Sequence, residues 1–241
     1  MMNRCNRVMI TGTNRGIGLA LVSAFLKDDY QVFATVRHRE NCEDLNRLQE
    51  KKGHGQLQIH EMDVTLESSV GNTFQQMNLQ TSRLDLLINN AGVYPENGDE
   101  LFEDLNPEWF EKTIQVNYLG TVRVTRHFLP LLKNSPKASV VNMSSGAASI
   151  TTKEDGRRYC YGASKAALNM FSRTLAAELK SSGIIVVALS PGWVRTEMGG
   201  PNADLSIEES AEAIVKTSAE LTMENTGQFL DRFGISGKYA W

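Results

Sequence analysis

Residues 8–18, VMITGTNRGIG, decide the fold of this chain. Four residues that favour a strand run directly into a turn with three glycines, and apolar residues then recur at helical spacing over residues 19–26. In a strand–turn–helix of this kind, glycines let the backbone approach a pyrophosphate, whose charge lies against the free N–H groups at the start of the helix. The spacing is TGxxxGxG rather than the commoner GxGxxG. It indicates a dinucleotide-binding unit, and the alternative is a tight turn without a ligand.

Short apolar segments and helical segments alternate along the rest of the chain. We expect strands at residues 8–11, 31–36, 57–61, 84–89, 138–143, 184–189 and 228–230, and helices at residues 19–26, 41–52, 67–81, 108–133, 159–180 and 207–221. Strands separated by helices imply parallel βαβ units with right-handed crossovers. The sequence therefore predicts an α/β fold, a single Rossmann-type doubly wound parallel sheet of about seven strands with helices on both faces. We expect one domain over residues 1–241.

The composition is that of an ordinary globular protein, with 41% hydrophobic and 22% charged residues. A net charge of −3 gives no general attraction to nucleic acid or to anionic membranes, and no apolar run approaches the length of a membrane span. Cys5, Cys42 and Cys160 lack the spacing of a disulfide framework or a zinc site. We therefore expect no metal, no nucleic-acid or membrane partner, and a reducing, cytoplasmic location.

The residues after the second expected strand indicate which dinucleotide binds. In this fold an acidic residue about 20 positions past the glycines holds the free 2′-hydroxyl of NAD. Here Arg37 occupies that place, 19 residues after Gly18, and Arg15 adds a second cation inside the glycine turn. Two guanidinium groups suit a 2′-phosphate, which accepts paired, charge-assisted hydrogen bonds. The sequence predicts NADP(H) rather than NAD(H), and the alternative is a solvated basic turn.

Tyr161 and Lys165 are four residues apart in the expected helix 159–180. That spacing places both side chains on one face of a helix. A free phenol titrates near about 10, and a neighbouring ammonium group favours the phenolate, so the pair could serve as an acid–base group at neutral pH. The alternative is a surface Tyr beside a surface Lys, because the spacing by itself is common.

The motifs TGTNRGIG, NNAG, Asn117, a pair of serines, YGASK and PGWVRT follow one another in the order that is typical of the short-chain dehydrogenase/reductases. The resemblance extends over about residues 8–233. Within that superfamily, the stretches SSGAASI and PGWVRTEMGG are similar to the C-factor and sniffer type of carbonyl reductase.

The resemblance implies four catalytic residues. Tyr161 would protonate the carbonyl oxygen in the reductive direction, and Lys165 would hold the nicotinamide ribose and lower the pKa of that Tyr. Ser145 would orient the substrate oxygen, with Ser144 as the competing candidate for this role. Asn117 would hold a water molecule in a proton relay that ends at Lys165.

The same resemblance implies a set of cofactor-binding residues. The glycine turn would hold the pyrophosphate, Arg15 and Arg37 the 2′-phosphate, and the later segments the adenine, the ribose and the nicotinamide. The set is Gly12, Asn14, Arg15, Gly16, Ile17, Gly18, Arg37, Asp63, Val64, Asn90, Ala91, Gly92, Tyr161, Lys165, Pro191, Gly192, Val194 and Thr196.

The residues expected to face the substrate are apolar or aromatic. They are Val93, Tyr94, Ala147, Trp193 and Met198, with Tyr239 and Trp241 as further candidates from the tail. None is a cation for a carboxylate or phosphate, and a largely apolar pocket suits a neutral ketone, aldehyde or quinone. The expected partner is thus a small carbonyl compound, although Trp193 and Met198 are equally compatible with a place in the core.

One departure from the family concerns the 15 residues between Ser145 and Tyr161, where many members have 12. The charged stretch 153–158 lies near the helices that usually form the family's dimer, so the expected homodimer is in question. Residues 199–205 are either a mobile lid or a solvent loop. Two rival functions are a signalling or scaffold protein that retains the fold, and a different reaction such as epimerisation. The four catalytic residues argue against the first, and the lack of a substrate domain argues against the second.

Overall fold

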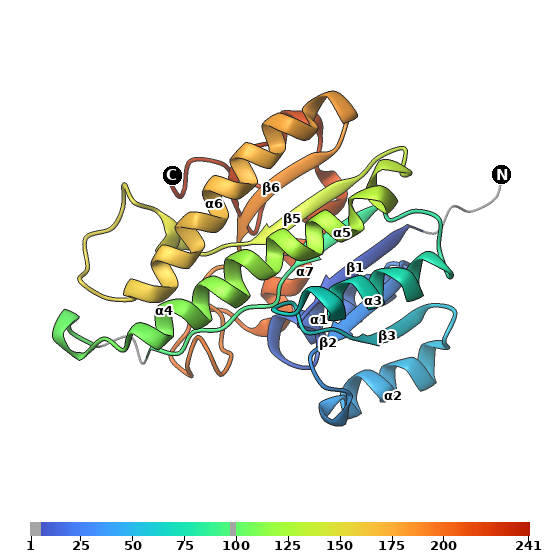
Figure 1. Cartoon of the computed structure of the whole chain (residues 1–241), viewed down its shortest axis with the longest axis horizontal. Coiled ribbons are helices and arrows are strands. Elements are labelled where there is room, and N and C mark those ends of the chain that lie inside the picture. The colour runs from blue at the N-terminus through green and yellow to red at the C-terminus, as the bar shows by residue number, and fades with distance from the viewer. Residues whose placement is uncertain (1–5, 97–99) are drawn as a thin grey trace.

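The computed structural model describes residues 6–96 and 100–241, so Cys5 lies outside the described residues. Seven parallel strands form one sheet in the order β3-β2-β1-β4-β5-β6-β7 (Figure 1). The strands are β1 (Arg7–Thr11), β2 (Gln31–Val36), β3 (Leu57–Glu61), β4 (Leu86–Asn89), β5 (Ser139–Met143), β6 (Ile185–Ser190) and β7 (Phe229–Asp231). The predicted fold class is confirmed.

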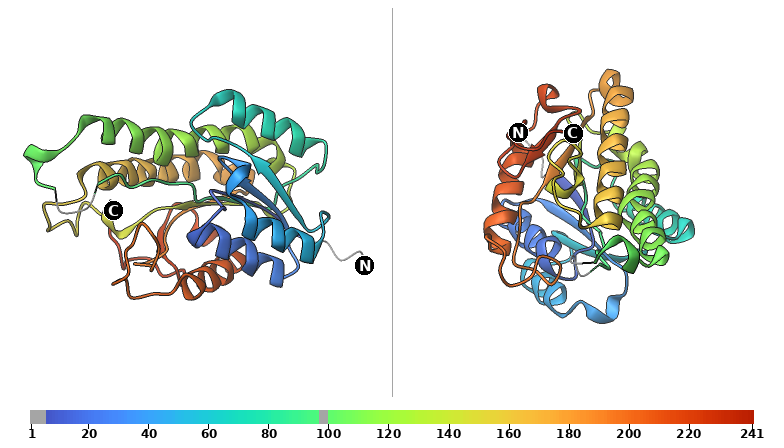
Figure 2. Two further views of the ribbon diagram at one scale, coloured as in Figure 1. Left: turned by 90° about the horizontal axis from the view of Figure 1, so that it is seen from below. Right: turned by 90° about the vertical axis from the view of Figure 1, so that its left-hand side faces the viewer.

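Helices cover both faces of this sheet (Figure 2). They are α1 (Gly16–Lys27), α2 (Glu43–Lys52), α3 (Glu67–Asn78), α4 (Pro107–Thr113), α5 (Thr121–Lys133), α6 (Tyr159–Leu179) and α7 (Ile207–Glu220). Successive strand residues point to opposite faces, so Val8 and Ile10 pack in the core under α1, α2 and α7, whereas Met9 packs in the core under α3, α5 and α6. Because both faces are covered, the inner strands are mainly apolar, and the buried polar residues Asn89 of β4 and Asn142 of β5 bond to each other.

The strand order reverses at β1. The chain runs from β1 outward through β2 and β3, and β4 then returns to pair with the other side of β1. In open α/β sheets, the crevice at such a switch point binds the ligand. The carboxyl ends of β1 and β4 approach closely here, since a Cβ atom on Gly12 would lie 2.8 Å from Cα of Ala91. Gly12 also has a φ of +70°, a conformation that favours glycine.

The predicted helix 108–133 is divided into three parts. Helix α4 ends at Thr113, α5 begins at Thr121, and a π-helical segment, Ile114–Gly120, lies between them. Such segments are rare and often occur at functional sites. Asn117 lies in the middle of this one and is fully buried.

No helix within the described ranges is long and apolar enough to cross a membrane. The two cysteines in those ranges, Cys42 and Cys160, are buried thiols.

Candidate active site

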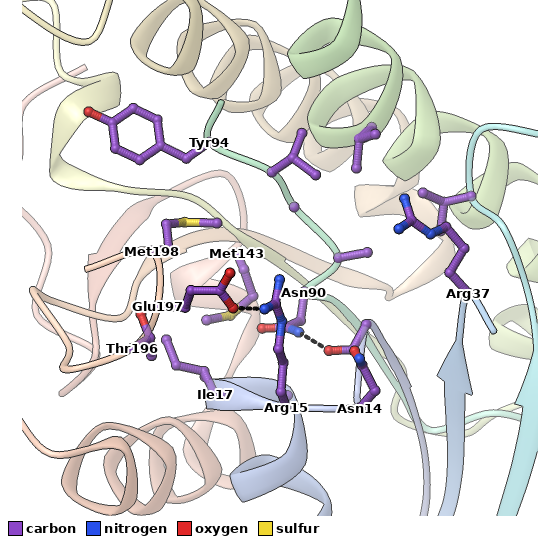
Figure 3. Close-up of a pocket in the computed structure, with 18 of the residues that line it drawn as sticks. Asn14, Arg15, Ile17, Arg37, Asn90, Tyr94, Met143, Thr196, Glu197 and Met198 are labelled. Carbon is purple, nitrogen blue, oxygen red and sulfur yellow. Dashed lines mark hydrogen bonds and ion pairs between the residues drawn. The ribbon is translucent and has the colours of Figure 1, made fainter. Parts of the chain in front are cut away.

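A cleft of about 690 Å³ follows the carboxyl ends of the strands (Figure 3). All of the predicted cofactor residues line it except Gly192 and Val194. Val194 is only 3% exposed and pairs with Leu205 in an isolated parallel bridge, and a Cβ atom on Gly192 would lie 2.6 Å from Cδ1 of Leu205. These two residues therefore anchor the segment after β6 instead of facing the cleft.

The glycine turn presents the start of α1 to this cleft. Arg15 precedes the helix without a side-chain cap, and the first turn holds no acidic residue, so the helix start is suited to an anion. The turn is tied to the end of β4 by Asn90, whose Nδ2 donates to the carbonyl oxygens of Thr11 at 2.8 Å and of Gly12 at 3.0 Å. The donor set and the close backbone approach fit a dinucleotide pyrophosphate.

The two cations expected at the 2′-phosphate lie apart. Arg15 is directed toward Glu197 and forms an ion pair with it, whereas Arg37 lies at the end of β2 on the other side of the view in Figure 3. Among the described residues, Arg37 has no ion-pair partner. No sequence pattern indicates Glu197, since its position beside Arg15 depends on how the segment after β6 folds back over the turn.

Lys165 is held firmly beside Tyr161. Its Nζ lies 5.7 Å from the centroid of the Tyr161 ring and donates to the carbonyl oxygen of Met143 at 2.7 Å. Only 4% of Lys165 is exposed, and burial lowers the pKa of its ammonium group to about 8. Lys165 is thus buried and Tyr161 half-buried, so the predicted Tyr/Lys pair is not a pair of surface side chains.

The hydroxyl of Ser145 lies close enough to the phenol of Tyr161 to act on its pKa. Burial raises this pKa above the usual 10.0, while the Ser145 hydroxyl and the charge of Arg158 act in the opposite direction. Lys165 was the residue predicted to lower the pKa of Tyr161. In the structure, the neighbouring cation that lowers the pKa of this phenol is Arg158, the residue that precedes α6.

The structure separates the two candidate serines. Ser144 is 2% exposed and donates its hydroxyl to Oδ1 of Asn169 at 2.6 Å. Ser145 is the one that meets Tyr161, and its Oγ also accepts the N–H of Ala147 at 3.2 Å. The geometry therefore favours the serine chosen from the resemblance.

The carboxamide of Asn117 is fully engaged. Its Oδ1 accepts the N–H of Val93 at 2.8 Å, and its Nδ2 donates to the carbonyl oxygen of Val93 and to Oγ of Ser164, both at 3.0 Å. The backbone carbonyl of Asn117 also accepts Oγ1 of Thr121 at 3.2 Å. The side chain of Asn117 is thus occupied by Val93 and Ser164.

The expected substrate residues are distributed over several places. Val93, Tyr94 and Met198 line the cleft, whereas Ala147 lines a second hollow of about 260 Å³. Trp193 is 53% exposed and donates its indole N–H to the carbonyl oxygen of Gly199 at 2.7 Å. It thus braces residues 199–205.

The C-terminal residues and two cations that were not predicted lie near the cleft and the second hollow. The rings of Tyr239 and Trp241 lie 5.4 Å and 5.6 Å from that of Phe229, so the tail folds back onto β7. Lys112 of α4 lines the main cleft, and Arg158 lines the second hollow. The predicted set of substrate-facing residues contained no cation. It missed Lys112 and Arg158 because both lie in segments far in sequence from the predicted apolar residues.

The fold and the site together define a Rossmann-type oxidoreductase with a Tyr–Lys pair. A family model described as short chain dehydrogenase matches residues 6–206, and the chain belongs to the short-chain dehydrogenase/reductase family.

The relatives include carbonyl reductases. The structure of the carbonyl reductase Sniffer of D. melanogaster is 33% identical, with a TM-score of 0.92 over 99% of this chain and 100% of that one. The NADPH-bound carbonyl reductase from chicken fatty liver is 32% identical, with a TM-score of 0.90 over the same shares. The C-signal protein of Myxococcus xanthus is 38% identical over 160 residues, which are 65% of this chain and 93% of that protein. The predicted resemblance to the sniffer type is confirmed.

Proposed function

We propose that this protein uses NADPH to reduce a neutral, largely apolar ketone, aldehyde or quinone to an alcohol, with Tyr161 as the proton donor. The observation that carries the proposal is the buried Lys165 beside the Tyr161 ring, both lining a cleft that is continuous with the glycine turn. The two carbonyl reductases to which the chain is similar support the same reaction class.

The cleft fits NADP(H). The start of α1 would hold the pyrophosphate, and Arg37 would take the 2′-phosphate. The chicken carbonyl reductase, which is similar over almost the whole chain, is described as NADPH bound. When bound, the nicotinamide supplies the hydride, and the residues of this chain supply position and a proton.

The proton chemistry follows from the environment of Tyr161. Because burial raises the pKa of the phenol, Tyr161 keeps its proton at neutral pH and can act as an acid. Ser145 would hold the substrate oxygen beside it. Lys165 would bind the ribose hydroxyls, as its buried Nζ lines the cleft next to the phenol.

The substrate is expected between Tyr94 and Met198. Both line the cleft, and the Tyr94 ring centroid lies 5.0 Å from that of Tyr161. Of the cations nearby, Arg158 is paired with Asp155 at 2.6 Å, which favours a neutral substrate at the centre of the site. The homodimer, the single domain and the cytoplasmic location stay predictions.

A second candidate is a signalling protein that retains the fold without catalysis, since the chain is similar to the C-signal protein. The deciding experiment follows the absorbance of NADPH with a panel of ketones, aldehydes and quinones, with Tyr161→Phe as the control. We expect turnover that the control lacks. Binding of NADPH without turnover of any compound would favour the signalling role.

A further inference from the structure

Helix α6, which carries Tyr161 and Lys165, begins without a cap from its own neighbours. The preceding residue, Arg158, has left-handed backbone angles (φ 59°, ψ 45°), and its side chain makes no capping hydrogen bond. The first turn also holds no acidic residue. The first N–H groups of a helix have no partner inside the helix, and buried ones need an acceptor.

Glu96 supplies this acceptor from a distant part of the chain. Its Oε1 accepts the N–H of Cys160 at 2.9 Å, and its Oε2 accepts the N–H of Tyr161 at 2.8 Å, across 64 and 65 residues of sequence. The side chain is only 4% exposed. A carboxylate at a helix start makes charge-assisted bonds and is favoured by the helix dipole. Glu96 ends a short segment, residues 92–96, which we call the strap.

The strap connects this cap with the rest of the catalytic residues. The backbone N–H and carbonyl of Val93 are both bonded to the Asn117 side chain, at 2.8 Å and 3.0 Å. The next residue, Tyr94, places its ring 5.0 Å from that of Tyr161, at an interplanar angle of 54°. Figure 3 shows Tyr94, in the middle of the strap, above the cleft. The strap is therefore joined to α6 at the turn that holds the phenol.

We propose that Glu96 is a positioning residue for Tyr161, and that its two hydrogen bonds hold the first turn of α6 so that the phenol meets Ser145. The proposal rests on the function proposed above, in which Tyr161 donates the proton. A displacement of about 1 Å between reacting groups can cost on the order of 10²-fold in rate, so loss of the cap is expected to lower kcat.

The charge of Glu96 predicts a second effect. A carboxylate beside the helix start disfavours a phenolate in the same turn, so its removal is expected to lower the pKa of Tyr161. Among the described residues, the other titratable groups around this turn and in the adjoining cleft wall include Tyr94, Glu100, Lys112, Arg158, Tyr159, Cys160 and Lys165. None of these groups is substituted in the Glu96 variants below, so a shift in the pKa of Tyr161 would reflect the loss of the Glu96 charge.

Three substitutions separate the hydrogen bonds from the charge. Glu96→Gln fills the same space but turns one acceptor into a donor, so it loses the charge and one N–H bond. We expect its kcat to fall on the order of tenfold, with an unchanged KM for NADPH and a basic limb of kcat at lower pH. Glu96→Ala loses both bonds and should lose on the order of 10²-fold in kcat. Glu96→Asp keeps the charge and should recover part of kcat.

The matched control is Glu103→Gln. Glu103 is an exposed acid in the same connection between β4 and α4, and its side chain does not contact α6 in any described hydrogen bond or ion pair. This variant removes the same charge from the same connection. We expect kcat, KM and the pH profile of Glu103→Gln to equal those of the wild type.

A second readout does not depend on activity. The ultraviolet difference spectrum of tyrosinate, taken with Tyr161→Phe as the blank, reports ionisation of Tyr161 in every variant. If the wild type reduces no carbonyl compound, the proposed function fails, while this titration still tests Glu96. If Glu96→Gln lowers the melting temperature but leaves kcat, the basic limb and the titration unchanged, Glu96 is only a structural cap and the proposal is overturned. Should Glu96→Ala not fold, the isosteric Gln variant decides.

Discussion

The two walls of the cleft are built in different ways. The cofactor wall, residues 12–18 with Arg37, comes mostly from one contiguous turn, and its charged groups are exposed; the Arg15 side chain is 68% exposed. The catalytic wall, by which we mean the four proposed catalytic residues Asn117, Ser145, Tyr161 and Lys165, comes from three distant segments, and of these Tyr161 and Lys165 line the cleft itself. Two of its members, Asn117 and Lys165, are at most 4% exposed.

The difference has a physical reason. A charged side chain that binds a phosphate can stay exposed to water, so its desolvation costs little free energy. A group that moves a proton needs a defined position and a dry environment, which long-range packing and hydrogen bonds provide. Substitutions in the catalytic wall should therefore change kcat, and substitutions in the cofactor wall should change KM and the choice of cofactor.

The largest effect is expected for Tyr161→Phe. It removes the proton donor and leaves the ring in place, so kcat for reduction should fall on the order of 10²–10⁴-fold. The affinity for NADPH, measured by fluorescence titration, should change little because the phenol's role is proton transfer. Turnover within about threefold of the wild type would remove Tyr161 from the mechanism.

Lys165→Met tests the cost of the buried charge. Activity should fall on the order of tenfold or more, since Lys165 is expected to hold the ribose. The free energy of unfolding, however, should rise at pH 7. Burial lowers the pKa of Lys165 from 10.5 to about 8, which corresponds to an upper limit on the order of 3 kcal/mol at roughly 1.36 kcal/mol per pH unit.

The sign of the pH dependence follows from that shift. Between pH 8 and 10.5 the unfolded chain binds more protons at Lys165 than the folded protein, so the wild type gains stability as the pH rises. The stability advantage of Lys165→Met should therefore shrink over this window in urea titrations. An advantage that stays constant with pH would show that Lys165 is not buried as an ammonium group.

Arg37→Asp tests the cofactor wall. Charge-assisted hydrogen bonds contribute on the order of 1.5–3 kcal/mol, so we expect the wild type to prefer NADPH over NADH by about 10²-fold in kcat/KM. The variant should reverse this preference, because it sets a carboxylate against the phosphate dianion. Both cofactors need to be compared at one ionic strength, since salt weakens exposed pairs. A wild type that uses NADH equally well would contradict the role of Arg37.

The smallest effect is expected for Glu197→Gln. Its carboxylate pairs with Arg15 across the cleft and competes with a phosphate for that guanidinium group. Exposed pairs contribute about 0–1 kcal/mol, so the KM for NADPH should fall no more than about fivefold, and less at high salt. The matched control is Glu212→Gln, an exposed acid 3.7 Å from Lys27. Equal KM values for both variants would mean that Glu197 does not restrain Arg15.

Sequence patterns predicted regular elements better than interruptions. The bounds of β2 and β3 were predicted to the residue, because apolar strand residues and the breaks around them are local signals. Residues 108–133 were predicted as one long helix, straight or kinked, whereas the π-helical segment Ile114–Gly120 divides them. A side chain on Gly120 would lie 2.8 Å from Cγ2 of Val64, so this segment is shaped by packing against the loop after β3. No local pattern reports such a contact.

The sequence by itself determined the α/β fold, the glycine turn and the Tyr161/Lys165 pair. Each of these depends on residues that are close in the chain, so the spacing alone carries the geometry. The tertiary structure decided which serine meets Tyr161, that Arg158 lies near its phenol, and that Glu96 caps its helix. The Glu96 contact joins residues 65 positions apart, and such contacts depend on how strands and helices pack, which no single stretch of sequence encodes.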